Sequence, residues 1–311
     1  MPDSHRTPLR LGAHLVPGLW RHMLPPGLAR LTFPAERRAT CADCPRVKSD
    51  GYRPDYRCCT YHPRVPNFLL GLALGEPGGT ARLARVRERG FLMPEAFQPS
   101  PGQWVDFLLD VFENRFGQSE KVLCPFLESG LCGIYGYRNA VCSTYFCHFD
   151  QGEAGEKFWE SLQTLVVQVE LALGQWALTE VGFDVPAYVA RLNDLAAGGD
   201  VRHTVAAGGG WSEAARRAAW GDAFGRELDV YAACAAKIEE RLPELWRIAN
   251  ATPILEADAF EIACEKLLPE ERRDLVEDDW SDPDRVTVPP RDLWRTVQRR
   301  HRRLWKSVSQ T

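Results

Sequence analysis

The sequence predicts a mainly α-helical protein in which an irregular, cysteine-rich layer packs against a C-terminal helical bundle. Apolar residues recur at helical spacing through most of the second half, whereas eight of the ten cysteines lie in the first half, in segments without sustained periodicity. We therefore predict a cysteine-rich region over residues 1–150, with inserted helices at about 67–120, and an all-helical region over 151–311 packed on it.

The first region combines irregular and helical stretches. Residues 1 to about 66 are rich in Pro, Arg and Gly, and we expect loops and short turns there rather than a conventional core. One helix is predicted over about 81–89, ending at Gly90, and residues 121–150 are again irregular. A second helix is predicted from an apolar face made of Trp104, Phe107, Leu108, Val111 and Phe112.

The second region is predicted to be helical throughout. An apolar stripe from Phe158 to Ala177 indicates a long helix, and Asp184 and Ser212 are placed to cap the N-termini of two later ones. Further helices are expected over 222–241, 243–250 and 254–268, with a terminal helix after Pro289 and Pro290.

Composition excludes several classes of protein. A hydrophobic content of 45% and a charged content of 26% argue against a disordered chain. The net charge of −4 gives no bulk case for binding nucleic acid or an anionic membrane. The longest apolar stretch, near Phe68 to Leu74, is far shorter than the roughly 20 residues that span a bilayer. With no signal-peptide pattern, we expect a cytoplasmic protein whose protein or small-molecule partner is unknown.

Charge is separated near the C-terminus. From Leu255 to Asp284, twelve acidic residues against three basic ones give a net charge of −9. From Arg291 to Lys306, seven basic residues against one acidic give +6. We interpret both as solvated helix faces that partly pair with each other, with a docking surface as the alternative.

The clustered cysteines predict a metal site, because in a reducing compartment grouped thiols serve as ligands more often than as bridges. Cys41 and Cys44 form a C-x2-C pair, the spacing at which one turn directs two thiolates at one metal. The adjacent Cys58 and Cys59 suit a polynuclear cluster or two centres. The predicted ligands are Cys41, Cys44, Cys58, Cys59, Cys124, Cys132, Cys142 and Cys147, the last four in sequence too irregular for a regular helix or strand. Cys234 and Cys264 are predicted to be buried apolar residues.

Iron–sulfur is favoured over zinc as the content of the site. Cys44 and Cys124 each precede a proline, as in bacterial iron–sulfur motifs, and the two paired knuckles of a four-cysteine zinc site are absent. We predict one or two centres of the 4Fe-4S type, with zinc as the alternative. Arg138 would offset cluster charge, and Tyr135 and Tyr145 would exclude water. His62 or His148 could each supply a nitrogen ligand instead of lying nearby.

The stretch from Cys124 to Cys142 (CPFLESGLCGIYGYRNAVC) resembles the signature of YkgJ-type cysteine-cluster proteins, a zinc- or iron-chelating group related to flagellin lysine N-methylases. Two departures are visible. Thirteen residues separate Cys44 from Cys58, where the family has few, and Asn139 replaces the proline after Arg138. The resemblance implies a cysteine-bound metal centre, and through the methylases a cluster used beside S-adenosylmethionine to methylate protein lysines.

Three functions follow as hypotheses. The first is a metal-binding protein with a redox, sensing or cluster-dependent role. The second is an S-adenosylmethionine-dependent protein lysine methyltransferase, which only the resemblance implies. The third is a structural protein stabilised by zinc. No glycine-rich nucleotide loop, C-x3-C-x2-C spacing or Ser/His/Asp arrangement is found, so whether the chain is an enzyme stays open.

Overall fold

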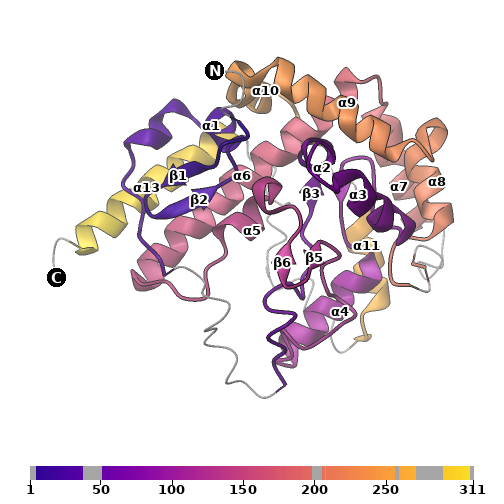
Figure 1. Cartoon of the computed structure of the whole chain (residues 1–311), viewed down its shortest axis with the longest axis horizontal. Coiled ribbons are helices and arrows are strands. Elements are labelled where there is room, and N and C mark those ends of the chain that lie inside the picture. Colours follow the sequence, from indigo (N-terminus) through magenta and orange to yellow (C-terminus); the bar gives the residue numbers. More distant parts are fainter. Residues whose placement is uncertain are drawn as a thin grey trace.

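The computed structural model describes residues 5–37, 51–197, 205–206, 208–255, 259–270 and 290–308. It is mainly helical, as predicted (Figure 1). In these ranges the strands form three short antiparallel pairs, in which Leu9 is opposite Val16, Val65 opposite Phe97 and Leu127 opposite Cys132. The pairs are β1 (Leu9–Leu11) with β2 (His14–Val16), β3 (Val65–Pro66) with β4 (Ala96–Phe97), and β5 (Leu127–Glu128) with β6 (Leu131–Cys132).

The long helix α6 (Gly152–Glu180) is the centre of the fold. From Leu165 to Gln175 its side chains are buried on every face, which is typical of a helix enclosed by others. It packs against α13 (Pro290–Val308), α10 (Leu245–Ala251), α5 (Ala140–Thr144) and α9 (Glu227–Glu240). The predicted stripe from Phe158 to Ala177 is therefore confirmed as a core helix, which begins four residues before the predicted Glu156.

Helix α2 (Asn67–Leu74) crosses α9 at very short range (Figure 1). A Cβ atom added at Gly71 would lie 2.0 Å from the carbonyl oxygen of Tyr231 and 2.7 Å from Cβ of Ala235. The absence of a side chain at Gly71 is thus what lets the two backbones approach. Helix α3 (Gly79–Glu88) follows, and Gly90 after it has a φ of +79°, which confirms the predicted helix end.

Helix α4 (Pro101–Phe112) starts with a reciprocal cap, in which Ser100 Oγ accepts from the Gln103 amide and the Gln103 side chain accepts from the Ser100 amide. It packs against α11 (Ala259–Leu267). The predicted apolar face is partly wrong, because Val105 and Leu108 are buried whereas Phe112 is 46% exposed at the C-terminal end of the helix.

Two predicted caps are confirmed at α7 (Val185–Ala197) and α8 (Glu213–Trp220). Asp184 Oδ1 accepts from the amide of Ala187 at 2.9 Å, and Ser212 Oγ accepts from that of Ala215 at 3.1 Å. Helix α9 begins five residues after the predicted position 222, because the 3-10 turn η6 (Gly221–Ala223) comes first. The helices predicted over 243–250 and 254–268 are observed as α10 and α11.

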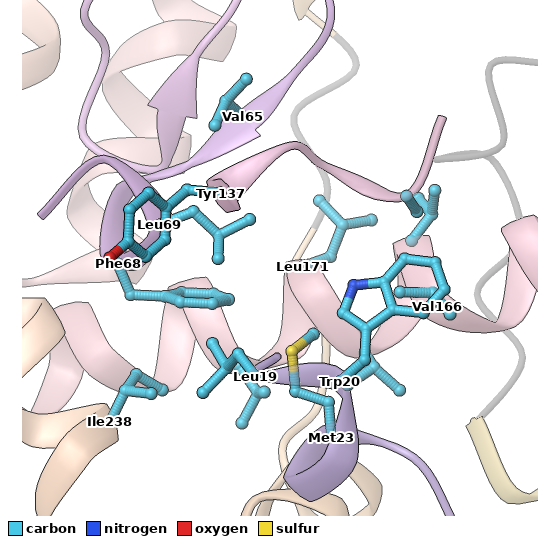
Figure 2. Packing of buried hydrophobic residues seen from close by; sticks show 14 of the residues in the cluster. Leu19, Trp20, Met23, Val65, Phe68, Leu69, Tyr137, Val166, Leu171 and Ile238 are labelled. Atoms are coloured by element: carbon cyan, nitrogen blue, oxygen red, sulfur yellow. The ribbon is translucent and has the colours of Figure 1, made fainter. Parts of the chain in front are cut away.

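The prediction that residues 1–66 lack a conventional core is wrong. The segment contains β1, β2, α1 (Trp20–Met23) and the 3-10 helix η1 (Pro26–Arg30). Leu19, Trp20 and Met23 are almost fully buried, and Figure 2 shows them beside Val166 and Leu171 of α6. Such short elements carry too few apolar residues to produce a period, so their burial depends on the helices that they contact. This main core extends along the chain from Leu11 to Leu304 and so includes residues from both predicted regions.

No helix in the described part of the chain combines the length and the apolar character that crossing a membrane requires.

Candidate metal centre

The adjacent cysteines Cys58 and Cys59 lie at the end of a tight turn. The amides of Arg57 and Cys59 bond the carbonyls of Arg53 and Tyr56, and Arg57 adopts a φ of +56°. The Cys59 carbonyl then accepts from the amide of Cys124 at 2.7 Å. This backbone bond joins two segments that lie 65 positions apart in the sequence.

The hairpin of β5 and β6 turns the chain back so that Cys132 approaches Cys124. Its turn residues Ser129 and Gly130 have φ values of +49° and +74°, the left-handed conformation that a two-residue hairpin turn requires. The hairpin is fixed at its base, because the Leu127 amide bonds the Cys124 carbonyl and the Gly133 amide bonds the Phe126 carbonyl. Cys132 is thereby brought back towards Cys124.

Helix α5 carries the next cysteine. Asn139 is its N-cap, with Oδ1 accepting from the Cys142 amide at 3.1 Å and Nδ2 donating to the Arg64 carbonyl at 2.9 Å. The buried Glu170 of α6 accepts from the Ala140 amide at 3.1 Å. The expectation that the later cysteines lie outside regular structure is therefore wrong for Cys132, in β6, and for Cys142, in α5. Asn139 supplies the signal that was missed, because Asn is a preferred N-cap.

Five thiols from these three segments influence one another electrostatically. They belong to Cys58, Cys59, Cys124, Cys132 and Cys142, and we call them the five-cysteine group. All five are free and partly buried. Because such effects require short distances within a protein, the fold gathers residues that the sequence separates by up to 84 positions.

Within the group, Cys58 differs from the other four. The hydrogen bond with the Cys59 thiol and, to a lesser extent, the charges of Arg138 and Arg57 together lower the pKa of Cys58 to about 7, although burial opposes them. The same bond, followed by burial, raises the pKa of Cys59 far above its usual value. Burial raises the pKa of Cys124 to about 12, and it also raises the pKa values of Cys132 and Cys142. One thiolate is thus favoured among four thiols.

Two arginines bring positive charge to the group. Arg138 stacks over the Tyr135 ring, 3.8 Å from its centroid, and donates to the Cys142 carbonyl at 3.3 Å. Arg57 lies over the hairpin, since a Cβ atom added at Gly130 would meet its guanidinium at 3.4 Å. Both lower the pKa of Cys58, so their charges favour thiolate at this place.

The other predicted site residues are distributed differently. Cys41 and Cys44 lie outside the described residues. Cys147 is partly buried in the loop after α5, and His148 beside it is exposed. Tyr135 and Tyr145 are 59% and 42% exposed, so the predicted water-excluding wall is not closed by these rings.

His62 is the buried member of the predicted set. Its ring contacts the rings of Phe91 and Phe97, and Nε2 lies 2.9 Å from the carbonyl oxygen of Leu123, the residue before Cys124. Burial lowers the pKa of His62 to about 4, so the ring is neutral at pH 7. His62 thus joins the Cys59 segment to the Cys124 segment.

Cys234 and Cys264 are buried apart from this group, as predicted. Cys234 packs in the main core, and Cys264 of α11 faces α4, with its sulfur 3.8 Å from the Pro101 carbonyl oxygen. They are therefore natural controls for the clustered cysteines.

In the described ranges, no group of three or more His, Cys, Asp or Glu side chains is arranged so that it could hold a metal ion. The chemistry of the donors nevertheless fits a thiolate-bound centre, because soft sulfur ligands suit iron–sulfur clusters and zinc. Comparisons of the chain with family models, curated proteins and solved structures found no match. The resemblance to the YkgJ-type signature therefore stays a prediction.

Proposed function

We propose that this chain is a metal-binding protein that carries a cysteine-bound iron–sulfur centre and acts through it in a redox, sensing or cluster-dependent role. The supporting observation is the five-cysteine group, whose three segments are joined by the Cys124–Cys59 backbone hydrogen bond, the β5–β6 hairpin and the hydrogen bond from Asn139 to the Arg64 carbonyl. Cys41 and Cys44 would complete the ligand set, and the YkgJ-type resemblance favours the same interpretation.

The surroundings suit thiolate ligands. Metal binding requires deprotonated sulfur, and Cys58 is already close to that state at neutral pH. Arg57 and Arg138 would offset the negative charge that several thiolates accumulate. Partial burial would limit solvent access, which tunes the potential of such a centre.

The decisive experiment is anaerobic purification followed by iron, zinc and acid-labile sulfide analysis and a visible spectrum. We expect brown protein in which iron and sulfide are present in equal amounts. Cys142→Ala should lose most of the iron and the colour, whereas the matched control Cys264→Ala should keep both. Circular dichroism of the two variants separates loss of the centre from loss of the fold.

Each other outcome has a definite meaning. Equal iron in the two variants would contradict the ligand assignment. Stoichiometric zinc without colour would replace this proposal with the zinc-stabilised structural protein. Binding of S-adenosylmethionine by the iron-loaded chain, measured by calorimetry, would favour the protein lysine methyltransferase that the resemblance implies.

A further inference from the structure

The C-terminal helix α13 separates its residues sharply by face. Its apolar face is buried, with Val297 and Leu304 fully enclosed, and the helix packs along α6 (Figure 1). From Pro290 to Lys306, every side chain that is exposed is basic. We call these six residues the basic stripe: Arg291, Arg295, Arg299, Arg302, Arg303 and Lys306.

The stripe is one continuous surface. At 100° per residue its six positions fall within an arc of about 120°, and they extend over about 22 Å of helix. Arg300 is not part of it, because Arg300 lies near Glu153 and Glu160 of α6 and affects their pKa values. Six positive charges therefore face solvent together on a chain whose net charge is −4.

Within the described residues, the five arginines of the stripe form a single ion pair. Asp292 is the one acidic residue in α13, and it lies 3.5 Å from Arg295. Arg299 donates to the Thr296 hydroxyl at 3.0 Å, which leaves its charge in place. Arg302 and Arg303 form no ion pair with any residue that the structure describes. Like charges on one face repel one another, so a polyanion would be favoured there.

The residues of the stripe favour one kind of polyanion over the others, which are an acidic protein, an anionic membrane and a single-stranded nucleic acid. A protein interface normally has an apolar or aromatic anchor, and no exposed residue of the stripe provides one. Insertion into a membrane needs a free apolar face, and that of α13 is occupied by α6. Single-stranded nucleic acid is held by exposed aromatic rings, which the stripe also lacks. Double-stranded DNA remains, with one negative charge per about 1.7 Å of its axis.

We propose that the basic stripe of α13 binds the phosphate backbone of double-stranded DNA without sequence preference. Five of its six residues are arginines, whose planar guanidinium groups bond two phosphate oxygens at once. This surface is separate from the five-cysteine group, so the inference does not depend on the proposed metal centre. The absence of bulk positive charge, which led us to expect no nucleic acid, does not describe this local surface.

The test is fluorescence anisotropy of a labelled duplex of about 20 base pairs with the full-length, anaerobically purified protein. We expect binding at about 50 mM salt that weakens as salt rises, because each phosphate contact contributes about 0.9 to the slope of log K against log salt. Reversing two charges, in Arg302→Glu with Arg303→Glu, should weaken binding about tenfold and lower the slope by about 2.

The control is a second double variant that changes the net charge of the protein by the same amount, at two arginines outside the basic stripe. Arg217 and Arg226 are exposed on α8 and before α9, and Arg217→Glu with Arg226→Glu should leave affinity within about twofold. No binding by the parent protein would overturn the proposal, as would an equal loss in both double variants. Binding to anionic phosphatidylserine vesicles but not to the duplex would replace DNA with a membrane as the partner.

Discussion

At the scale of single residues, Asn139 shows how one side chain can organise a site without being a ligand. Its amide oxygen caps the helix that carries Cys142, and its amide nitrogen satisfies the Arg64 carbonyl just before β3. Asn139 is 2% exposed, so water cannot replace either bond. The residue thus orients one ligand segment against the elements that support it.

Asn139→Ala should therefore destabilise the protein by about 2 kcal/mol, from a lost N-cap and an unsatisfied buried carbonyl. Asn139→Ser keeps a capping oxygen and should recover about 1 kcal/mol of that loss. Urea denaturation of the two variants and the parent measures both effects. Equal stability of the Ala and Ser variants would show that capping of α5 is not the cause.

At the scale of elements, two helix contacts depend on single residues: one on the absence of a side chain, the other on two side-chain hydrogen bonds. One is the contact between α2 and α9 at Gly71. The other fixes α13 to the N-terminal segment, where His301 accepts from the Thr32 amide at 3.2 Å and Trp305 Nε1 donates to the Thr32 carbonyl at 3.0 Å. Both contacts join parts of the chain that are distant in sequence.

Gly71→Ala should destabilise the protein by about 1–3 kcal/mol, because the new methyl group forces α2 and α9 apart. Gly75 is the matched control at the end of the same helix, since a Cβ atom there makes only ordinary contacts, at 3.4 Å or more, and its φ is −72°. Gly75→Ala should change stability by less than about 0.5 kcal/mol. Thermal unfolding of the Gly71→Ala and Gly75→Ala variants measures both changes in stability. Similar losses of stability in the two variants would contradict the close approach of α2 and α9 at Gly71.

The His301 contact predicts a pH effect. Burial lowers the pKa of His301 below its ordinary 6.5, and the ring must be neutral to accept from Thr32. Below pH 6.5 the unfolded chain therefore binds more protons than the folded one, and this contribution to stability is lost as pH falls. His301→Gln retains an acceptor that does not titrate. Urea denaturation at pH 7.5 and 5 should show a smaller loss for the variant; an equal loss would assign the effect to other groups.

At the scale of the whole molecule, the five-cysteine group lies on three segments of the first half of the chain, one of which, α5, packs against the core helix α6. One hydrogen bond joins Cys124 to Cys59, while α5 rests on α6 through Glu170 and Ala140. A bound centre would add further links between the three segments. Its stabilising effect would come from binding the folded chain more tightly than the unfolded chain.

Removing the metal anaerobically with a chelator should therefore lower the unfolding midpoint by several degrees and expose cleavage sites within residues 51–147. A loss of about 1–3 kcal/mol would be ordinary for a ligand that binds only the native state. Limited proteolysis with mass spectrometry locates the cuts. Cys142→Ala, lacking the centre, should show one midpoint with and without chelator, and a shift in that variant would mean that the chelator acts elsewhere.

Much of the helical architecture could be predicted from the sequence, because its signals are local. The stripe in α6, the caps at Asp184 and Ser212, and the end of α3 at Gly90 each depend on residues within a few turns of one another. The sequence predicts that Cys234 and Cys264, which lie outside the cysteine clusters, are buried apolar residues, and both are buried. Side-chain period and capping chemistry thus determined these elements without knowledge of the fold.

Tertiary structure decided what lies far apart in sequence. The burial of Leu19, Trp20 and Met23 depends on α6, which begins more than a hundred residues later. The clustering of the cysteines in sequence predicts that they are ligands, but which thiols lie near one another depends on the turn before Cys58, the β5–β6 hairpin and the Asn139 cap acting together. Sequence patterns report the local conformational preference of each segment, whereas the packing of distant segments depends on long-range contacts. The arrangement of the five-cysteine group is therefore known only from the tertiary structure.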